Sequence, residues 1–260
     1  MKYGMIGCGN MGSAILRALS KKTKDICVSD RCGKAAKTAA ELGVAYGDNR
    51  YIAENCDRIF LGVKPNGLAG VLQELQPVLR VRKPLLISMA AGVEIAAVEK
   101  LAGTELPVIR IMPNTPTAVG KGVIQYCFNE QAAPFLADWL QDMTFCGLLD
   151  LLDEKLIDAA SALSGSGPAY LYVMLDALAD GAVACGLPRD KALEYAAMTM
   201  AGAAEMYLQT KQHPGALKDA VCSPGGSTIE GICKLEENGF RGAVMDCVMA
   251  AYRKNKDLGK

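Results

Sequence analysis

Residues 2–12 have the sequence KYGMIGCGNMG, and this stretch decides the fold. A short apolar run at residues 2–6 leads directly into a turn with the spacing G-x-G-x-x-G, made by Gly7, Cys8, Gly9, Asn10, Met11 and Gly12. In such a turn the first glycine permits a tight bend and the second lets the backbone approach a pyrophosphate. The third glycine allows close packing of the following helix on the strand, and the helix start supplies free amides for the anion. The stretch therefore predicts a strand, a turn and a helix that bind a dinucleotide, rather than a tight turn without a ligand.

Short apolar runs alternate with helical segments from this turn to about residue 153. We expect buried strands at residues 2–6, 26–29, 58–63, 85–89 and 108–112. Between them, residues 67–79 carry Leu68, Val71, Leu72 and Leu75 at helical spacing, which gives one apolar face for packing on a sheet. The pattern predicts a Rossmann-type, doubly wound parallel sheet over residues 1–153.

The chain changes character after about residue 154. Strand-like runs stop, and residues rich in Ala, Met and Leu follow, with Gly186 and Pro188 at a predicted break between helices. Ser227 and Glu230 have the spacing of a capping box at the start of a later helix. We therefore expect an α/β fold class in which residues 154–260 form an all-α domain. Its helices are apolar on more than one side, so this domain is expected to associate with a second subunit.

Composition excludes several classes of protein. The 260 residues contain 28 basic and 28 acidic side chains. This balance leaves no excess of positive charge for binding nucleic acid or a membrane surface. A single histidine, His213, argues against imidazole-based zinc sites and hydrolase triads, so no metal is expected. The ten cysteines include no C-x-x-C pair, and the chain shows neither a secretory signal nor an uninterrupted apolar span. A cytoplasmic protein with reduced thiols is expected.

The residues after the second strand leave the choice of dinucleotide open. Asp30 stands where an acid would hydrogen-bond the ribose of NAD and repel a 2′-phosphate. Arg31 and Lys34, which follow at once, are the residue types that would pair with the phosphate of NADP. Asn49, after a short third strand, is a further candidate for the ribose side. Both NADP(H) and NAD(H) remain candidates.

Further candidate contacts follow other strands, where open α/β sheets bind their ligands. Val63, Lys64 and Pro65 follow the fourth strand, and Ala90 and Ala91 follow the fifth. Residues 112–116, MPNTP, form a rigid loop after the sixth strand. The first two segments suit contact with a flat nicotinamide ring, although each also fits ordinary strand termination, which explains residues 112–116 less well.

Two glycine clusters interrupt the helical half. Residues 164–168, SGSGP, precede one long helix, and residues 223–230, SPGGSTIE, precede another. The amides of Gly226, Ser227 and Thr228 would form a carboxylate-sized anion site, with the Thr228 hydroxyl as an added donor. A second anion site, separate from the dinucleotide turn, indicates a substrate that carries a carboxylate.

With these motifs in place, the chain resembles the pyrroline-5-carboxylate reductase family from end to end. The most specific match runs from His213-Pro214-Gly215 to the segment SPGGST at residues 223–228. The resemblance implies reduction of L-1-pyrroline-5-carboxylate to L-proline with NADPH or NADH, the last step of proline biosynthesis. It also implies a homodimer through the helical domain, or a ring of such dimers. Asp30 departs from the family pattern, in which a serine or another small polar residue is common.

The resemblance assigns site residues position by position. Thr228 would be the catalytic donor near the ring nitrogen, and substrate contacts would come from Gly226, Ser227 and Thr228. Cofactor contacts would come from Gly7, Cys8, Gly9, Asn10, Met11, Gly12, Asn49, Val63, Lys64, Pro65, Ala90 and Ala91, to which Asp30 and Arg31 are added from their position after the second strand.

Two other hypotheses fit parts of the sequence. β-Hydroxyacid dehydrogenases share the layout but use a lysine on the first long helix of the helical domain, and residues 168–185 contain no lysine. A dinucleotide-sensing scaffold protein would keep the N-terminal glycines but would not require an intact segment at residues 223–228.

Overall fold

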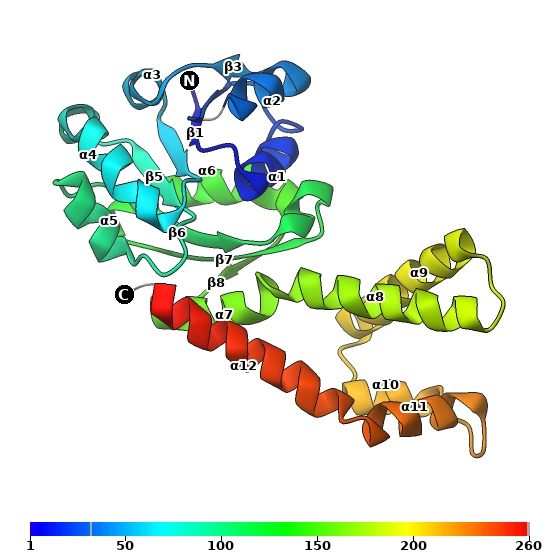
Figure 1. Ribbon diagram of the computed structural model, residues 1–260. Coiled ribbons are helices and arrows are strands. Elements are labelled where there is room, and N and C mark those ends of the chain that lie inside the picture. Colours follow the sequence, from blue (N-terminus) through cyan, green and yellow to red (C-terminus); the bar gives the residue numbers. More distant parts are fainter. Residues whose placement is uncertain (32, 259–260) are drawn as a thin grey trace. The chain divides into compact units, whose positions relative to one another are not determined.

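The computed structural model describes residues 1–31 and 33–258, which group into two compact units. The first unit contains Met1–Ser166 and the C-terminal residues from Ala250, and the second contains Gly167–Met249. Figure 1 shows the strands gathered in the N-terminal part and helices alone from residue 157 onward. The α/β fold class predicted from the sequence is confirmed.

The first unit is built on one eight-stranded sheet with the order β3-β2-β1-β4-β5-β6-β7-β8. Strand β1 lies in the middle, and the chain winds outward from it in both directions, as in a Rossmann fold. The strands are β1 (Tyr3–Ile6), β2 (Ile26–Ser29), β3 (Ala45–Tyr46), β4 (Arg58–Leu61), β5 (Leu85–Ser88), β6 (Val108–Pro113), β7 (Gly122–Phe128) and β8 (Gly147–Leu151).

Helices cover both faces of this sheet, and each face has its own apolar core. One core joins α1, α2 and α6 to side chains such as Met5, Phe60 and Ile111, and the other joins α3, α4 and α5 to Ile59 and Leu61. Neighbouring residues of a strand enter opposite cores because successive side chains alternate between faces. The helices are α1 (Asn10–Leu19), α2 (Lys34–Leu42), α3 (Asn49–Asn55), α4 (Pro65–Arg82), α5 (Ile95–Ala102), α6 (Ala133–Met143) and α7 (Ile157–Ser164).

The expectation of a wholly parallel sheet is wrong at one edge. Strands β1 to β6 are parallel, but β7 runs antiparallel to β6, and β8 is parallel to β7. The sequence interpretation did not include β7 and β8. A short 3-10 helix, Thr115–Val119, connects β6 to β7 and reverses the chain without a crossover helix. The sheet is therefore mixed.

The second unit is entirely helical within its described residues. It contains α8 (Gly167–Ala184), α9 (Arg189–Thr210), α10 (Pro214–Ala220), α11 (Ser227–Glu237) and the first part of α12 (Phe240–Leu258). The predicted break is confirmed, since Gly186 has a φ of 97° and Pro188 directly precedes α9. No helix in the described ranges is both long enough and apolar enough to cross a membrane.

Candidate functional site

The glycine turn between β1 and α1 has the geometry expected of its three glycines. Gly7 has a φ of 101°, and a Cβ there would lie 2.7 Å from the backbone of Gly62. A Cβ on Gly12 would lie 2.2 Å from the Gly7 carbonyl oxygen, so α1 packs directly on the turn. A Cβ on Gly9 would meet no atom within 4 Å. The second glycine thus leaves the start of α1 open to a ligand.

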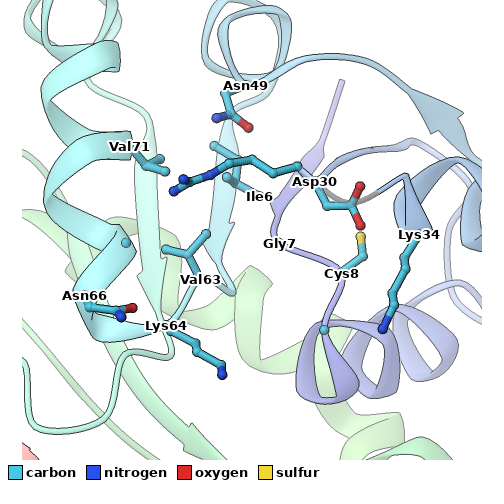
Figure 2. Close-up of a pocket in the computed structure, with 13 residues that line it drawn as sticks. Ile6, Gly7, Cys8, Asp30, Lys34, Asn49, Val63, Lys64, Asn66 and Val71 are labelled. Carbon is cyan, nitrogen blue, oxygen red and sulfur yellow. The ribbon is translucent and has the colours of Figure 1, made fainter.

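A cavity of about 530 Å³ lies beside this turn, at the carboxyl ends of β1, β2 and β4, and Figure 2 shows its side chains. This volume falls in the range of small-molecule and cofactor sites. The lining residues are Ile6, Gly7, Cys8, Gly9, Asp30, Arg31, Lys34, Asn49, Val63, Lys64, Asn66, Gly67 and Val71.

The structure brings eight of the predicted cofactor residues together in this cavity: Gly7, Cys8, Gly9, Asp30, Arg31, Asn49, Val63 and Lys64. Asn10 instead lines a neighbouring cavity of about 660 Å³ between α1 and α2, which also contains Arg17, Lys34 and Lys37. Ala90 is buried, and Ala91 is half-buried in the turn after β5. Neither alanine lines the two cavities, nor do Met11, Gly12 and Pro65.

Sequence reasoning missed the contribution of the first turns of α4. Asn66, Gly67 and Val71 line the cavity, although only the residues before this helix were predicted to do so. Lys64 precedes α4 in extended conformation, and Pro65 occupies its first turn, where a missing N–H leaves no hydrogen bond unmade. The predicted start of this helix could have identified them, because a helix that follows a Rossmann strand begins at the sheet edge where the ligand binds.

Asp30 is tied to the protein's own backbone. Its Oδ2 accepts a hydrogen bond from the Ala35 amide at 3.0 Å, and its Oδ1 is buried without a partner among the described residues. The buried Cys8 thiol points toward the Ser29 carbonyl at 3.9 Å. Burial, with a smaller contribution from the charge of Asp30, raises the pKa of Cys8 to about 12. Cys8 is therefore a neutral thiol at physiological pH, which fits a small packing residue rather than a nucleophile.

Asn49 is held in one orientation by the end of β2. The Ser29 hydroxyl donates to Asn49 Oδ1 at 2.7 Å, and Ser29 is itself buried. With Oδ1 engaged, the amide Nδ2 of Asn49 keeps both of its N–H groups for a ligand in the cavity.

The loop after β6 is fixed by a buried amide rather than by its prolines alone. Asn114 Nδ2 donates to the Ser164 carbonyl at 2.9 Å, and Asn114 Oδ1 accepts from the Val123 amide at 2.9 Å. The Ser164 hydroxyl in turn contacts the Gln125 side chain at 2.9 Å. One amide thus joins the end of β6, the start of β7 and the end of α7, which sequence spacing does not reveal.

The proposed substrate segment begins α11 in the second unit. Gly226 precedes the helix in extended conformation, and Ser227 and Thr228 are its first two residues, both exposed. The predicted capping box is wrong, because Ser227 lies inside the helix and Gly226 occupies the N-cap position without a side-chain cap. Since no side chain caps this end, the first amides of α11 remain available to an anion.

His213 has a local structural role. It is the N-cap residue of α10, and its Nδ1 accepts a hydrogen bond from the Gly215 amide at 3.1 Å. Within residues 1–31 and 33–258, no group of three or more His, Cys, Asp or Glu side chains is arranged to hold a metal ion.

A Rossmann sheet with an open glycine turn and a cofactor-sized cavity at its carboxyl edge defines an oxidoreductase of the NAD(P)-binding class. Comparison with known proteins gives the family. A model described as pyrroline-5-carboxylate reductase dimerisation matches residues 154–258, and one described as NADP oxidoreductase coenzyme F420-dependent matches residues 2–92. The chain belongs to the pyrroline-5-carboxylate reductase family.

Relatives that match along nearly their whole length support this family membership. A pyrroline-5-carboxylate reductase of Escherichia coli is 38% identical over 266 residues, covering 100% of this chain and 98% of the relative. One from Methanosarcina acetivorans is 41% identical, again covering 100% of this chain and 98% of the relative. The crystal structure of Plasmodium falciparum pyrroline carboxylate reductase with NADP bound is 33% identical, with a TM-score of 0.89 over 100% of this chain and 98% of that one.

Proposed function

We propose that this chain reduces L-1-pyrroline-5-carboxylate to L-proline with NADPH or NADH, the last step of proline biosynthesis. The observation that carries this proposal is the similarity to curated pyrroline-5-carboxylate reductases along the whole chain. The site chemistry agrees, because reduction of a cyclic imine needs positioning and a hydrogen-bond donor more than a strong acid.

The dinucleotide would be held by the glycine turn and the strand ends around it. The open start of α1 at Gly9 suits the pyrophosphate, and Asn10, Met11 and Gly12 supply backbone at the helix start. The residues after β4 and β5 would contact the nicotinamide half, with Val63, Lys64, Pro65, Ala90 and Ala91 in that role. When bound, the reduced nicotinamide supplies the hydride.

The substrate carboxylate would bind the start of α11. The amides of Ser227 and Thr228 are donors at the positive end of an 11-residue helix, where a negative charge is stabilised. The Thr228 hydroxyl would donate toward the imine nitrogen and orient the ring. A threonine hydroxyl is too weak an acid to protonate the imine, so the ring nitrogen would take its proton from solvent before or during hydride delivery.

Oxidation of NADPH and of NADH on addition of pyrroline-5-carboxylate tests this function directly. The expected result is substrate-dependent loss of the absorbance of the reduced nicotinamide with at least one cofactor, and formation of proline. Tight cofactor binding without turnover would refute the reductase assignment and indicate a non-catalytic dinucleotide-binding protein. Turnover of a 3-hydroxy acid instead would indicate a β-hydroxyacid dehydrogenase, although α8 has no lysine to serve that reaction.

We propose further that residues 1–153 act as the cofactor domain and residues 154–260 as the domain for dimerisation and substrate binding. A homodimer, or a ring of such dimers, is supported by the match of residues 154–258 to a dimerisation family. A cytoplasmic location is supported by the free thiols of all nine cysteines in the described residues. Light scattering would give the subunit number, and cell fractionation would test the location.

A further inference from the structure

The turn between β5 and α5, residues 89–94, lies next to the cofactor cavity. At its first residue, the Met89 amide donates to the Leu61 carbonyl at the end of β4, at 3.2 Å. A Cβ on Gly62 would lie 3.0 Å from the Met89 side chain. Val63, the residue after Gly62, lines the cavity. The turn therefore borders the edge of the cavity where the proposed function places the nicotinamide ring.

The helix that follows this turn has no cap from its own segment. The turn itself closes with a hydrogen bond from the Val93 amide to the Ala90 carbonyl at 3.3 Å, and Gly92 has a φ of 72°. Glu94 occupies the N-cap position of α5, but its side chain makes no capping hydrogen bond. The first amides of a helix have no partner within the helix, so the start of α5 depends on a group from elsewhere in the chain.

Glu154 supplies that group from 59 positions away. Its Oε1 accepts a hydrogen bond from the amide of Ile95, the first residue of α5, at 2.8 Å. The same oxygen accepts from Nη1 of Arg110 at 3.2 Å. Glu154 begins the short 3-10 helix Glu154–Leu156, which follows β8. The contact thus joins the end of the turn to a segment that lies far from it in the sequence.

Arg110 holds Glu154 in place from beneath the sheet edge. Its guanidinium on β6 is buried, and Nη2 donates to Oδ1 of Asp158 on α7 at 3.0 Å. Removing one partner of a buried ion pair is costly, so the two carboxylates and the guanidinium keep one arrangement. In the sheet, Arg110 lies opposite Ser88, the last residue of β5 before the turn. The cation that orients Glu154 is therefore fixed beside the start of the same turn.

We propose that Glu154 is a positioning residue of the reductase. By accepting the first amide of α5, it fixes the turn at Ala90 and Ala91, and this turn sets the position of the nicotinamide ring relative to the imine. The inference deepens the proposed function and rests on it for the identity of the ring and of the reaction.

Hydrogen exchange of the chain without any ligand tests the contact itself. Glu154→Ala should speed exchange of the Ile95 amide and of its neighbours in residues 90–95 by about tenfold, the scale of one hydrogen bond. Glu154→Gln retains an acceptor oxygen and should exchange nearly as the wild type does. The matched control is Asp158→Ala, which removes the other carboxylate of Arg110 and leaves the cap of α5 in place. Exchange in residues 90–95 should be unchanged in this control.

Kinetics with a reduced cofactor deuterated at the transferred position tests the effect on the reaction. Glu154→Ala should lower kcat with pyrroline-5-carboxylate by about 10- to 10²-fold, the effect of a displaced reacting group. The deuterium isotope effect should increase, because hydride transfer becomes the slow step. KM for the imine should change by less than about threefold, since the carboxylate site on α11 is intact. Glu154→Gln should recover most of the rate, and Asp158→Ala should keep the wild-type isotope effect.

These measurements separate positioning from a general loss of stability. A purely structural role would lower the melting temperature of Glu154→Ala and leave its exchange at residues 90–95 and its isotope effect like those of the wild type, which would overturn the inference. An equal loss of kcat in Asp158→Ala would also overturn it. Either result leaves the proposed function intact, provided that the wild type turns over. Failure of the wild type to oxidise the cofactor with pyrroline-5-carboxylate would refute the proposed function, and this inference with it.

Discussion

Thr228 is the side chain on which the chemistry depends in the proposed function, and its role can be tested without disturbing the fold. It is exposed at the start of α11, so replacing it removes a hydroxyl and no buried contact. We expect Thr228→Ala to lower kcat with pyrroline-5-carboxylate by about 10²- to 10³-fold, the effect of losing one preorganised donor. Thr228→Ser retains the hydroxyl and should recover most of the rate. Steady-state kinetics measures both variants, and an unchanged rate in Thr228→Ala would remove Thr228 from the mechanism.

A second residue-scale prediction concerns Asp142, a buried carboxylate on α6. It accepts a hydrogen bond from the Tyr3 hydroxyl at 2.7 Å and an ion pair from Lys2 at 2.6 Å. Burial alone would raise the pKa of Asp142, but the hydrogen bonds from Lys2 and Tyr3 and the charges of Lys2 and Arg58 outweigh it and lower the pKa. Since the folded-state pKa is depressed, the stabilisation is complete above the unfolded pKa of about 4 and is lost as pH falls below it.

Urea unfolding measures this contribution. At pH 7, Asp142→Asn should reduce the free energy of unfolding by about 2 kcal/mol, and the difference from wild type should shrink below about pH 4. The matched control is Asp138→Asn on the same helix, whose 70%-exposed carboxylate pairs with Arg58 and should contribute less than about 1 kcal/mol. A difference for Asp142→Asn that stays constant between pH 3 and pH 7 would contradict the assigned ionisation.

At the scale of elements, substitutions in the glycine turn and α1 can distinguish a glycine needed only for cofactor binding from one that the fold also needs. Gly9 precedes α1 with an ordinary φ of −69°, and a Cβ there meets open space, so Gly9→Ala should leave the melting temperature nearly unchanged. The added methyl group occupies space that the pyrophosphate needs, and cofactor affinity should fall by about tenfold or more. Gly12→Ala should lose stability as well, because its Cβ would lie 2.2 Å from the Gly7 carbonyl. Calorimetry and thermal unfolding distinguish the two, and normal cofactor affinity in Gly9→Ala would contradict the pyrophosphate position.

The elements also show what the sequence could and could not predict. Strand β1, the glycine turn and α4 were predictable because each depends on a local pattern of apolar and glycine residues. Strand β8 was not, since Leu148 and Leu151 on it remain more than half exposed and the strand lacks a buried run. The predicted N-cap of α11 was wrong by one residue, because the extended backbone at Gly226 sets where the helix begins. The Asn114–Ser164 contact joins residues 50 positions apart, which no local pattern encodes.

At the scale of the whole molecule, the second unit has too little core of its own. Its buried apolar residues within the described range are three alanines, Ala179, Ala192 and Ala196. Large apolar side chains on its helices are exposed, among them Leu171, Tyr172, Val173, Tyr195, Met198, Met206, Val221 and Met245. Monomeric proteins rarely expose so many large apolar groups, so these helices need a covering surface, and the dimerisation family match supports a second copy of the chain.

Two matched valine substitutions test where that surface lies. Val173 on α8 is 72% exposed, and Val81 on α4 of the first unit is 84% exposed. Val173→Glu would place a charge in an apolar interface without a partner, so light scattering should show dissociation toward the monomer and a lower melting temperature. Val81→Glu adds the same charge to a solvent-facing position and should keep the wild-type mass. Met198→Glu, 69% exposed on α9, repeats the test on a second helix. Wild-type mass in both the Val173 and Met198 variants would place the interface elsewhere, whereas dissociation of either one assigns the exposed helices to contact between subunits.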